Sequence, residues 1–118
     1  MQHLKQIRIA IATIGHKGLN DKLSKVYGKT KTFTIVDVNE GKFTNVRTID
    51  NPGLAYSQGS GPIASKTLAE MEVDWVIASQ LGPGASELLK SHKIKTMLAD
   101  VTNTVAEALE EALSRLSK

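Results

Sequence analysis

The first half of the chain contains three apolar segments with the pattern of β-strands. Residues 7–14 (IRIAIATI) alternate isoleucine with smaller residues, and because the alanines are apolar as well, we expect a central strand covered on both faces. Residues 31–38 (KTFTIVDV) are rich in β-branched side chains, which favour a strand. The turn at residues 39–42 contains a glycine and predicts a hairpin. In its second strand, residues 43–49, the apolar positions are not spaced by two, so we expect a bulged edge strand.

The second half of the chain alternates helix patterns with strand patterns. A proline in the first turn is typical of a helix start, and Pro62 and Pro83 both precede apolar residues at helical spacing. Thr104 and Glu107 stand three residues apart and form a capping-box pattern, which predicts a third helix. The elements expected in this half are a helix from residue 60, a strand over 73–79, a helix from residue 83, a strand over 94–98 and a helix from residue 104.

The order of these elements predicts an α/β fold. It is β-β-β-α-β-α-β-α, with one further short helix expected over residues 19–27. Helical crossovers between strands in one sheet are right-handed and make those strands parallel, while the hairpin adds an antiparallel portion. We therefore expect a mixed five-stranded sheet flanked by helices, in a single domain that comprises residues 1–118.

Composition excludes several classes of protein. The chain is 41% hydrophobic and 23% charged, which is typical of a soluble globular protein, and no apolar run approaches the roughly 20 residues that span a bilayer. We expect no membrane association. The chain has no cysteine and no recognisable export signal, so we expect a cytoplasmic location without disulfides. A net charge of +3 with 4% aromatic residues argues against nucleic-acid binding.

Several glycine-bearing loops are predicted to gather at one edge of the sheet. Ligands of an open α/β sheet bind outside the carboxyl ends of its parallel strands. The helix starts at Pro62 and Pro83 would bring unpaired N–H groups and a partial positive charge to this edge, which suits an anion. Glycine and proline also punctuate ordinary turns, and no loop matches a phosphate-binding or dinucleotide-binding fingerprint. The loops in question are residues 13–18, 56–62, 79–84 and 99–104.

No set of catalytic residues stands out in the sequence. No serine has an identifiable histidine and acid companion, and no pair of carboxylates falls in a loop at the predicted edge. The order of elements invites comparison with ribonuclease H, whose chemistry needs an acid on the first strand to help hold two metal ions. Residues 7–13 (IRIAIAT) contain no acid, which excludes a nuclease. We expect a protein that is not an enzyme.

The sequence resembles the dinitrogenase iron–molybdenum cofactor biosynthesis family. The likeness runs in order from residue 7 to residue 113. It implies a ribonuclease H-like fold without a nuclease site, and it implies the handling of iron–sulfur precursors of the nitrogenase cofactor. The segments that carry it are IRIAIAT, KVYGKTKTFTIVDVNEGKFTNVRTIDNP, VDWVIASQLGPGASELLKSHKIK and TVAEALEEAL.

Some positions follow the family pattern and others depart from it. Gly28 matches the glycine of the family's HFGRAPYF stretch, and Lys29 replaces its arginine. Val26 stands where this pattern has a histidine, and the region 56–59, which often carries histidine in relatives, has none here. With no cysteine, His16 remains as the soft-metal ligand near the edge, so the residues argue against direct coordination of a cluster. Further matches to the family are Phe33, Gly82, Pro83, Thr104 and Glu107.

These observations predict a non-enzymatic carrier. Its cargo would be an anionic iron–sulfur or iron–molybdenum cofactor precursor, or another small anionic ligand, with a protein of cofactor assembly as a further partner. The alternative is a protein-interaction module of the same fold with a vestigial ligand site. His16 is the candidate metal ligand. The predicted ligand-binding residues are Thr13, Gly15, His16, Lys17, Gly28, Lys29, Gly59, Gly61, Gln80, Gly82, Gly84 and Thr102.

Overall fold

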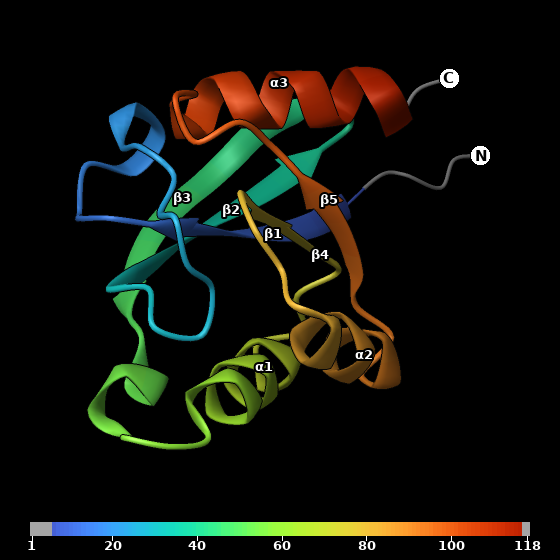
Figure 1. Ribbon diagram of the computed structural model, residues 1–118. Helices are drawn as coiled ribbons and strands as arrows, with labels where there is room; N and C mark the ends of the chain where they lie inside the picture. Colours follow the sequence, from blue (N-terminus) through green and yellow to red (C-terminus); the bar gives the residue numbers. More distant parts are fainter. Residues whose placement is uncertain (1–5, 117–118) are drawn as a thin grey trace.

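Five strands form one mixed sheet in the order β3-β2-β1-β4-β5. A computed structural model describes residues 6–116 of the chain (Figure 1). β1 pairs antiparallel with β2 and parallel with β4, β2 pairs antiparallel with β3, and β4 pairs parallel with β5. The predicted α/β class, the β-β-β-α-β-α-β-α order and the mixed sheet are confirmed. The strands are β1 (Gln6–Thr13), β2 (Thr32–Asn39), β3 (Lys42–Asp50), β4 (Trp75–Ala78) and β5 (Lys95–Leu98).

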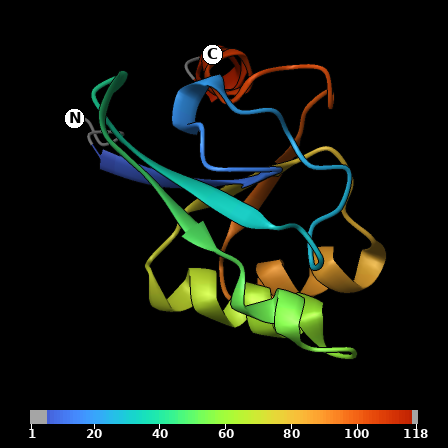
Figure 2. The ribbon, with the colours of Figure 1, turned by 90° about the vertical axis from the view of Figure 1, so that its left-hand side faces the viewer.

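Three helices cover the two faces of the sheet, as the side view in Figure 2 shows. On one face, α1 and α2 bury Leu68 and Leu89 against Ala10 and Ile35. On the other face, α3 buries Leu109 in a separate core cluster. Because β1 and β4 contribute side chains to both clusters, these central strands are apolar on both faces, as residues 7–14 predicted. The helices are α1 (Ser60–Glu70), α2 (Pro83–Ser91) and α3 (Val105–Leu116).

The hairpin and the edge strand also match their prediction. Glu40 and Gly41 form the turn with φ of 52° and 83°, the left-handed values that a tight hairpin turn requires. The register shifts where Asp37 pairs with Asn45 and Val38 pairs with Phe43, which leaves one extra residue in β3. A bulge of this kind twists an exposed edge and protects it from pairing with another chain.

The segment between β1 and β2 differs from its prediction, because the helix expected over residues 19–27 is wrong. Only one turn of 3-10 helix forms, at Gly18–Asn20, and the chain then runs back along the end of β1. The Ser24 amide donates to the Ala12 carbonyl at 2.8 Å, and the Ile14 amide donates to the Lys22 carbonyl at 3.3 Å. These backbone groups pair with β1 and are therefore not free for helical hydrogen bonds.

The strand directions bring several connections to one edge of the sheet. β1, β4 and β5 are parallel, and β3 runs the same way because it is antiparallel to β2. Their carboxyl ends therefore share an edge, which we call the loop edge, and α1 and α2 begin there (Figure 1). None of the helices within residues 6–116 is both long enough and apolar enough to cross a membrane.

Candidate functional site

A hollow of about 350 Å³ lies between the starts of α1 and α2, at the loop edge. The chain contributes to it from three places: the segment before β2, the first turn of α1, and the connection from β4 into α2. We call it the α1/α2 hollow. It brings together five of the predicted ligand-binding residues, which are Gly28, Lys29, Gly61, Gln80 and Gly82. The remaining lining residues are Val26, Tyr27, Ser60 and Ala85.

Both helix starts at this hollow lack a side-chain cap within the described part of the chain. The first N–H groups of a helix have no intrahelical partner and carry part of the positive end of the helix dipole. In α1 these donors belong to Ser60 and Gly61, because Pro62 has no N–H; in α2, where Pro83 has no N–H, the donor that lines the hollow belongs to Ala85. Two uncapped helix starts at one hollow make a place where an anion can accept hydrogen bonds.

Gly28 packs directly against the first turn of α1. A Cβ at this position would lie 3.0 Å from the Gly61 nitrogen and 3.2 Å from the Ser60 Oγ atom, closer than real Cβ atoms normally approach. The absence of a side chain therefore lets the loop reach the helix start and form the third wall of the hollow.

Asn51 holds this loop in place from the far side. Its buried side chain donates from Nδ2 to the carbonyls of Gly28 and Thr30, both at 2.9 Å, and its Oδ1 accepts from the Gly53 amide at 2.9 Å. A buried amide that satisfies three backbone groups ties separate loops rigidly together. Sequence reasoning missed Asn51, although an asparagine before Pro-Gly is a known signal for such a local backbone contact.

The side chains of Lys29 and Tyr27, on either side of Gly28, determine the charge of the wall that this loop forms. The Lys29 ammonium is exposed and contacts the carbonyl of Tyr56, so its charge stays at the rim of the hollow. The Tyr27 hydroxyl lies 2.9 Å from the Ser65 Oγ atom inside the core. Burial raises the pKa of Tyr27 to about 12, so this residue remains neutral over the physiological range. Lys29 therefore supplies the side-chain charge of the hollow.

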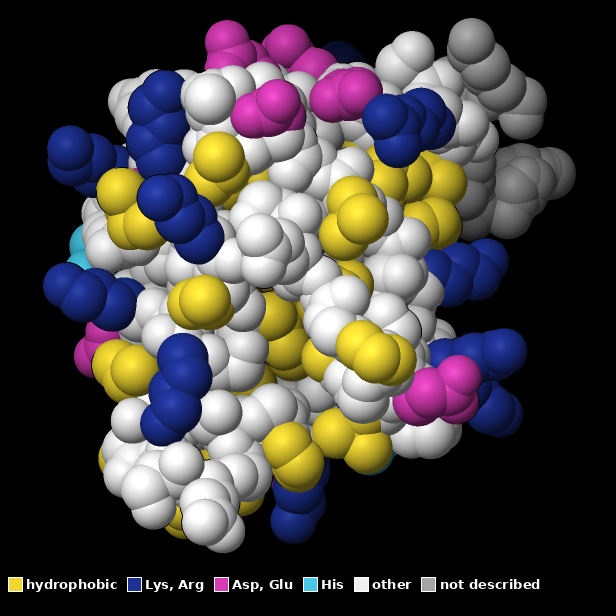
Figure 3. Space-filling model, viewed as in Figure 1, with side chains coloured by type: hydrophobic (Ala, Val, Ile, Leu, Met, Phe, Trp, Pro, Cys, Tyr) yellow, Lys and Arg dark blue, Asp and Glu magenta, His cyan; other side chains and the backbone are white. Residues whose placement is uncertain are grey.

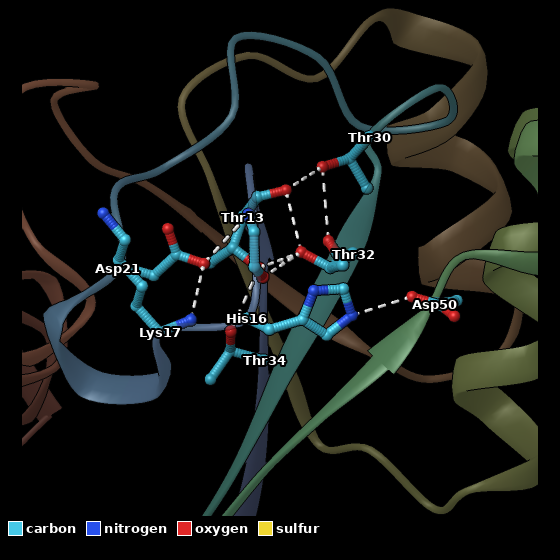
Figure 4. Close-up of polar contacts among 9 residues, drawn as sticks. Thr13, His16, Lys17, Asp21, Thr30, Thr32, Thr34 and Asp50 are labelled. Atoms are coloured by element: carbon cyan, nitrogen blue, oxygen red, sulfur yellow. Dashed lines mark hydrogen bonds and ion pairs between the residues drawn. The ribbon is translucent and has the colours of Figure 1, made fainter.

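A second hollow at the loop edge, of about 590 Å³, contains His16 and Gly15. We call it the His16 hollow. The His16 Nε2 atom lies 2.9 Å from Asp50 Oδ1, and the two side chains point toward each other in Figure 4. Both are largely exposed. The hollow is otherwise lined by Ile14, Lys31, Thr32, Asp50, Asn51, Leu54 and Ala55.

Thr13 belongs to the interior of the fold and lines neither hollow. It is fully buried, and its hydroxyl lies 2.7 Å from that of Thr32 and 3.0 Å from that of Thr34. Thr30 closes the cluster by donating to the Thr13 carbonyl at 2.7 Å (Figure 4). The expected role of Thr13 as a donor to a ligand does not fit this burial; its hydroxyl joins β1 to β2 instead.

The other predicted ligand-binding residues lie along the loop edge outside the two hollows. Gly59 is exposed with φ of 79° and precedes α1, and Gly84 is exposed in the first turn of α2. Lys17 is exposed beside Asp21. The Thr102 hydroxyl donates to Asp100 at 2.8 Å, so it already has a partner.

Asp21 is a second residue that sequence reasoning missed. It is only 2% exposed, and its carboxylate accepts from the amides of Gly15 and Lys22 at 3.0 and 2.9 Å. These bonds hold the loop that carries His16 against the end of β1. As a metal ligand, His16 has little support: within residues 6–116, no three His, Cys, Asp or Glu side chains form a group that could hold a metal ion.

A family model for dinitrogenase iron–molybdenum cofactor proteins matches residues 5–115, almost the whole chain. The chain belongs to this family. The resemblance predicted from the sequence is thereby confirmed. A curated relative, an uncharacterised protein of Methanocaldococcus jannaschii, is 29% identical over 84 residues, which is 71% of each chain.

Solved structures of similar proteins have the same fold. The apo form of the orange protein from Desulfovibrio gigas matches with a TM-score of 0.82 at 24% identity, over 98% of this chain and 92% of that one. A candidate NifB protein from Thermotoga matches with a TM-score of 0.72 at 32% identity, over 92% of this chain and 88% of that one. The first likeness shows the fold alone, and the second also supports the family.

Proposed function

We propose that this protein is a non-enzymatic carrier that binds an anionic precursor of an iron–molybdenum cofactor in the α1/α2 hollow. The supporting observation is that two uncapped helix starts and Lys29 meet at one hollow, in a chain of the cofactor family. The precursor is cargo, so the protein needs to hold and release it rather than transform it.

The donors at this hollow fit an anion better than a bare metal ion. The chain has no cysteine, and the residues at the hollow offer backbone N–H groups, an amide and an ammonium. The sulfides of an iron–sulfur cluster accept hydrogen bonds, and the net negative charge of such a cluster is attracted by helix starts and by lysine. The iron atoms of the cluster would keep the ligands that they carry before binding, because the protein would contact the cluster through hydrogen bonds and charge alone. Such a site would bind reversibly, as a carrier requires.

The experiment is a binding titration of anaerobically prepared protein. The probes are a water-soluble [4Fe–4S] cluster with small thiolate ligands, inorganic sulfate and inorganic phosphate, each followed by thermal unfolding. A ligand that binds only the folded state raises the unfolding temperature, by several degrees when its concentration is about 100 times its dissociation constant. We expect the cluster to produce this shift and the small anions to produce a weaker one.

Matched variants locate the binding. Lys29→Gln removes the charge at the hollow, and we expect it to weaken cluster binding about tenfold, since a charge-assisted contact contributes roughly 1–3 kcal/mol. Lys66→Gln removes the same charge from an exposed position within α1 and should leave the affinity unchanged. No shift with any probe would contradict the carrier and favour the interaction module.

A further inference from the structure

The positive charge of the chain is concentrated between β1 and β2. Residues 14–31 contain five lysines and one acid, Asp21, which gives this segment a net charge of +4, whereas the whole chain has +3. The remainder of the chain is therefore slightly negative. Asp21 is buried and its carboxylate accepts backbone amides, so it does not form ion pairs at the surface. The lysines, all exposed, are Lys17, Lys22, Lys25, Lys29 and Lys31.

Exposed apolar side chains gather on the same face. Among the described residues, six large hydrophobic side chains are substantially exposed, and four of them lie either within residues 14–31 or in the segment 54–56, which lines the His16 hollow and contacts Lys29. Such a concentration is informative, because scattered exposed hydrophobics need no explanation whereas a contiguous group marks an interaction site. The four are Ile14, Val26, Leu54 and Tyr56, which are 53, 46, 44 and 49% exposed.

Two hollows and one contact connect several of these residues. Ile14, Lys31 and Leu54 line the His16 hollow. Val26 and Lys29 line the α1/α2 hollow, and the Lys29 ammonium contacts the Tyr56 carbonyl. The segment from Val26 to Lys31 thus forms the ridge between the two hollows. We call the whole surface, the five lysines with Ile14, Val26, Leu54 and Tyr56, the basic–apolar face.

The space-filling view shows the same separation of charge. In Figure 3, Lys and Arg side chains run down the side that carries the loop between β1 and β2, with hydrophobic side chains between them. In this view, acidic side chains gather mainly over α3. This helix contains Glu107, Glu110 and Glu111.

We propose that the basic–apolar face is a docking surface for a protein partner with an acidic surface and apolar contact residues. Four apolar side chains would form the central contacts, and the lysines around them would attract carboxylates and speed the encounter. Nucleic acid fits this face less well than a protein does. Phosphates gain nothing from contact with exposed aliphatic side chains, and this face offers a single aromatic ring, Tyr56, on which a base could stack. A partner here would also cover the mouth of the α1/α2 hollow.

The test uses cargo-free protein and amide chemical shifts from NMR. Two peptides of equal charge serve as probes, one with the repeat Glu-Glu-Leu and one with the repeat Glu-Glu-Gly. We expect the leucine peptide to shift amides of residues 14–31 and 54–56 and to bind about tenfold more tightly than the glycine peptide, because apolar contacts add to the charge term. Its affinity should fall about tenfold between about 50 and about 300 mM NaCl, as screening increases.

Matched double variants separate this face from general charge effects. Lys25→Glu with Lys31→Glu should weaken the leucine peptide more than tenfold, while Lys66→Glu with Lys90→Glu, the same charge change at exposed positions of α1 and α2, should change it less than twofold. Ile14→Ser with Leu54→Ser should remove the preference for leucine, and Leu98→Ser on β5, at the opposite edge of the sheet, should keep it.

Five results would overturn the proposal, and the first four concern the peptide titrations. These are no binding of either peptide, shifts centred elsewhere, equal losses in the matched controls, or tighter binding to duplex DNA or phosphatidylserine vesicles than to the leucine peptide. Self-association that rises with protein concentration would instead assign the face to a second copy, through the acidic α3, and would also overturn it. Lys29 is left intact in these variants, so cluster binding can succeed or fail independently.

Discussion

At the scale of single residues, Gly28 is the position where the smallest change should disturb the α1/α2 hollow. Gly28→Ala places a Cβ 3.0 Å from the Gly61 nitrogen, so the loop or the helix start must move. Overpacking of this kind costs about 1–3 kcal/mol of unfolding free energy, and the displaced wall should weaken cluster binding. Chemical denaturation and the cluster titration measure the two effects.

Gly84→Ala is the control for this substitution. Gly84 lies in the first turn of α2, and a Cβ there would meet nothing within 4 Å. Alanine should therefore be neutral or stabilise the protein by roughly 0.5 kcal/mol through helix propensity. Equal stability of the Gly28→Ala and Gly84→Ala proteins would contradict the close packing.

The pair Arg8–Asp37 gives the stability a defined dependence on pH. Arg8 Nε donates to Asp37 Oδ1 at 2.7 Å, and this hydrogen bond, aided by the charge of Arg8, holds the pKa of Asp37 below its usual value. A carboxyl whose pKa is lower in the folded state stabilises the protein above its unfolded-state pKa, and this contribution disappears as the pH falls through the folded-state pKa. Both side chains are about a third exposed or less.

We expect Asp37→Asn to lower the unfolding free energy by about 1 kcal/mol at neutral pH, a value reduced for partial solvent screening. The difference from the unaltered protein should shrink as the pH falls below the usual range of an aspartate. Glu111→Gln breaks the exposed pair with Arg115 on α3 and should cost at most about 0.5 kcal/mol. Denaturation curves across acidic pH measure both; a constant difference at all pH values would refute the role of Asp37.

The residues that sequence reasoning missed share one property: their buried side chains bind backbone groups of loops whose course depends on the fold. Asn51 satisfies carbonyls more than twenty residues earlier, and Asp21 satisfies amides on both sides of a loop. Which carbonyl lies beside Asn51 depends on the pairing of β2 with β3, and no local pattern records it. The burial of Thr13 escapes the sequence for a related reason, because a position at the end of β1 predicts the edge but not whether the hydroxyl points inward.

At the scale of elements, the ends of α1 and α2 each use a residue that suits a left-handed turn poorly. Glu72 and Lys93 have φ of 61° and 64°, and in both cases the next amide donates back into the helix, from Val73 to Leu68 and from Ile94 to Leu89. This is the arrangement in which glycine is preferred, because it has no Cβ to clash. The turns are held by the strands that follow them.

Lys93→Gly should therefore stabilise the protein. The left-handed conformation costs a residue with a Cβ about 1–2 kcal/mol, and the greater entropy of glycine in the unfolded chain cancels part of the gain. We expect a net increase of about 0.5–1 kcal/mol in unfolding free energy, measured by chemical denaturation. Glu87→Gly, at an exposed position in the middle of α2, should instead lose about 1 kcal/mol. A loss in both variants would contradict the structure of this turn.

Sequence patterns that lie within one helix or turn predict that element correctly. The capping box of α3 is present as expected, since the Thr104 amide donates to Glu107 Oε1 at 2.9 Å and the Glu107 amide donates to Thr104 Oγ1 at 3.2 Å. The helix expected over residues 19–27 failed because tertiary contacts compete for its backbone groups: Ser24 pairs with Ala12 of β1, and Asp21 takes neighbouring amides. Local propensity decides only where no such competitor exists.

At the scale of the whole molecule, the sheet separates two hydrophobic cores, and only one of them supports the α1/α2 hollow. The core under α1 and α2 also supports the α1/α2 hollow, because Tyr27, which lines the hollow, packs in the same cluster as Leu68. The core under α3 lies on the opposite face and contains no residue of the hollow. Stability and binding should therefore respond differently to the loss of volume on the two faces.

Leu109→Ala and Leu68→Ala test this separation with equal chemistry. Both leucines are fully buried, so each change should cost about 2–5 kcal/mol of unfolding free energy. Below the unfolding transition, Leu109→Ala should keep the cluster affinity of the unaltered protein, because its cavity lies beyond the sheet. Leu68→Ala should weaken binding, because Tyr27 and the wall formed by Gly28 can shift into the space that the leucine side chain leaves beside α1. Titration at low temperature, with denaturation curves to confirm that both variants are folded, distinguishes the two; equal losses of affinity would mean that the sheet transmits disturbances from one face to the other.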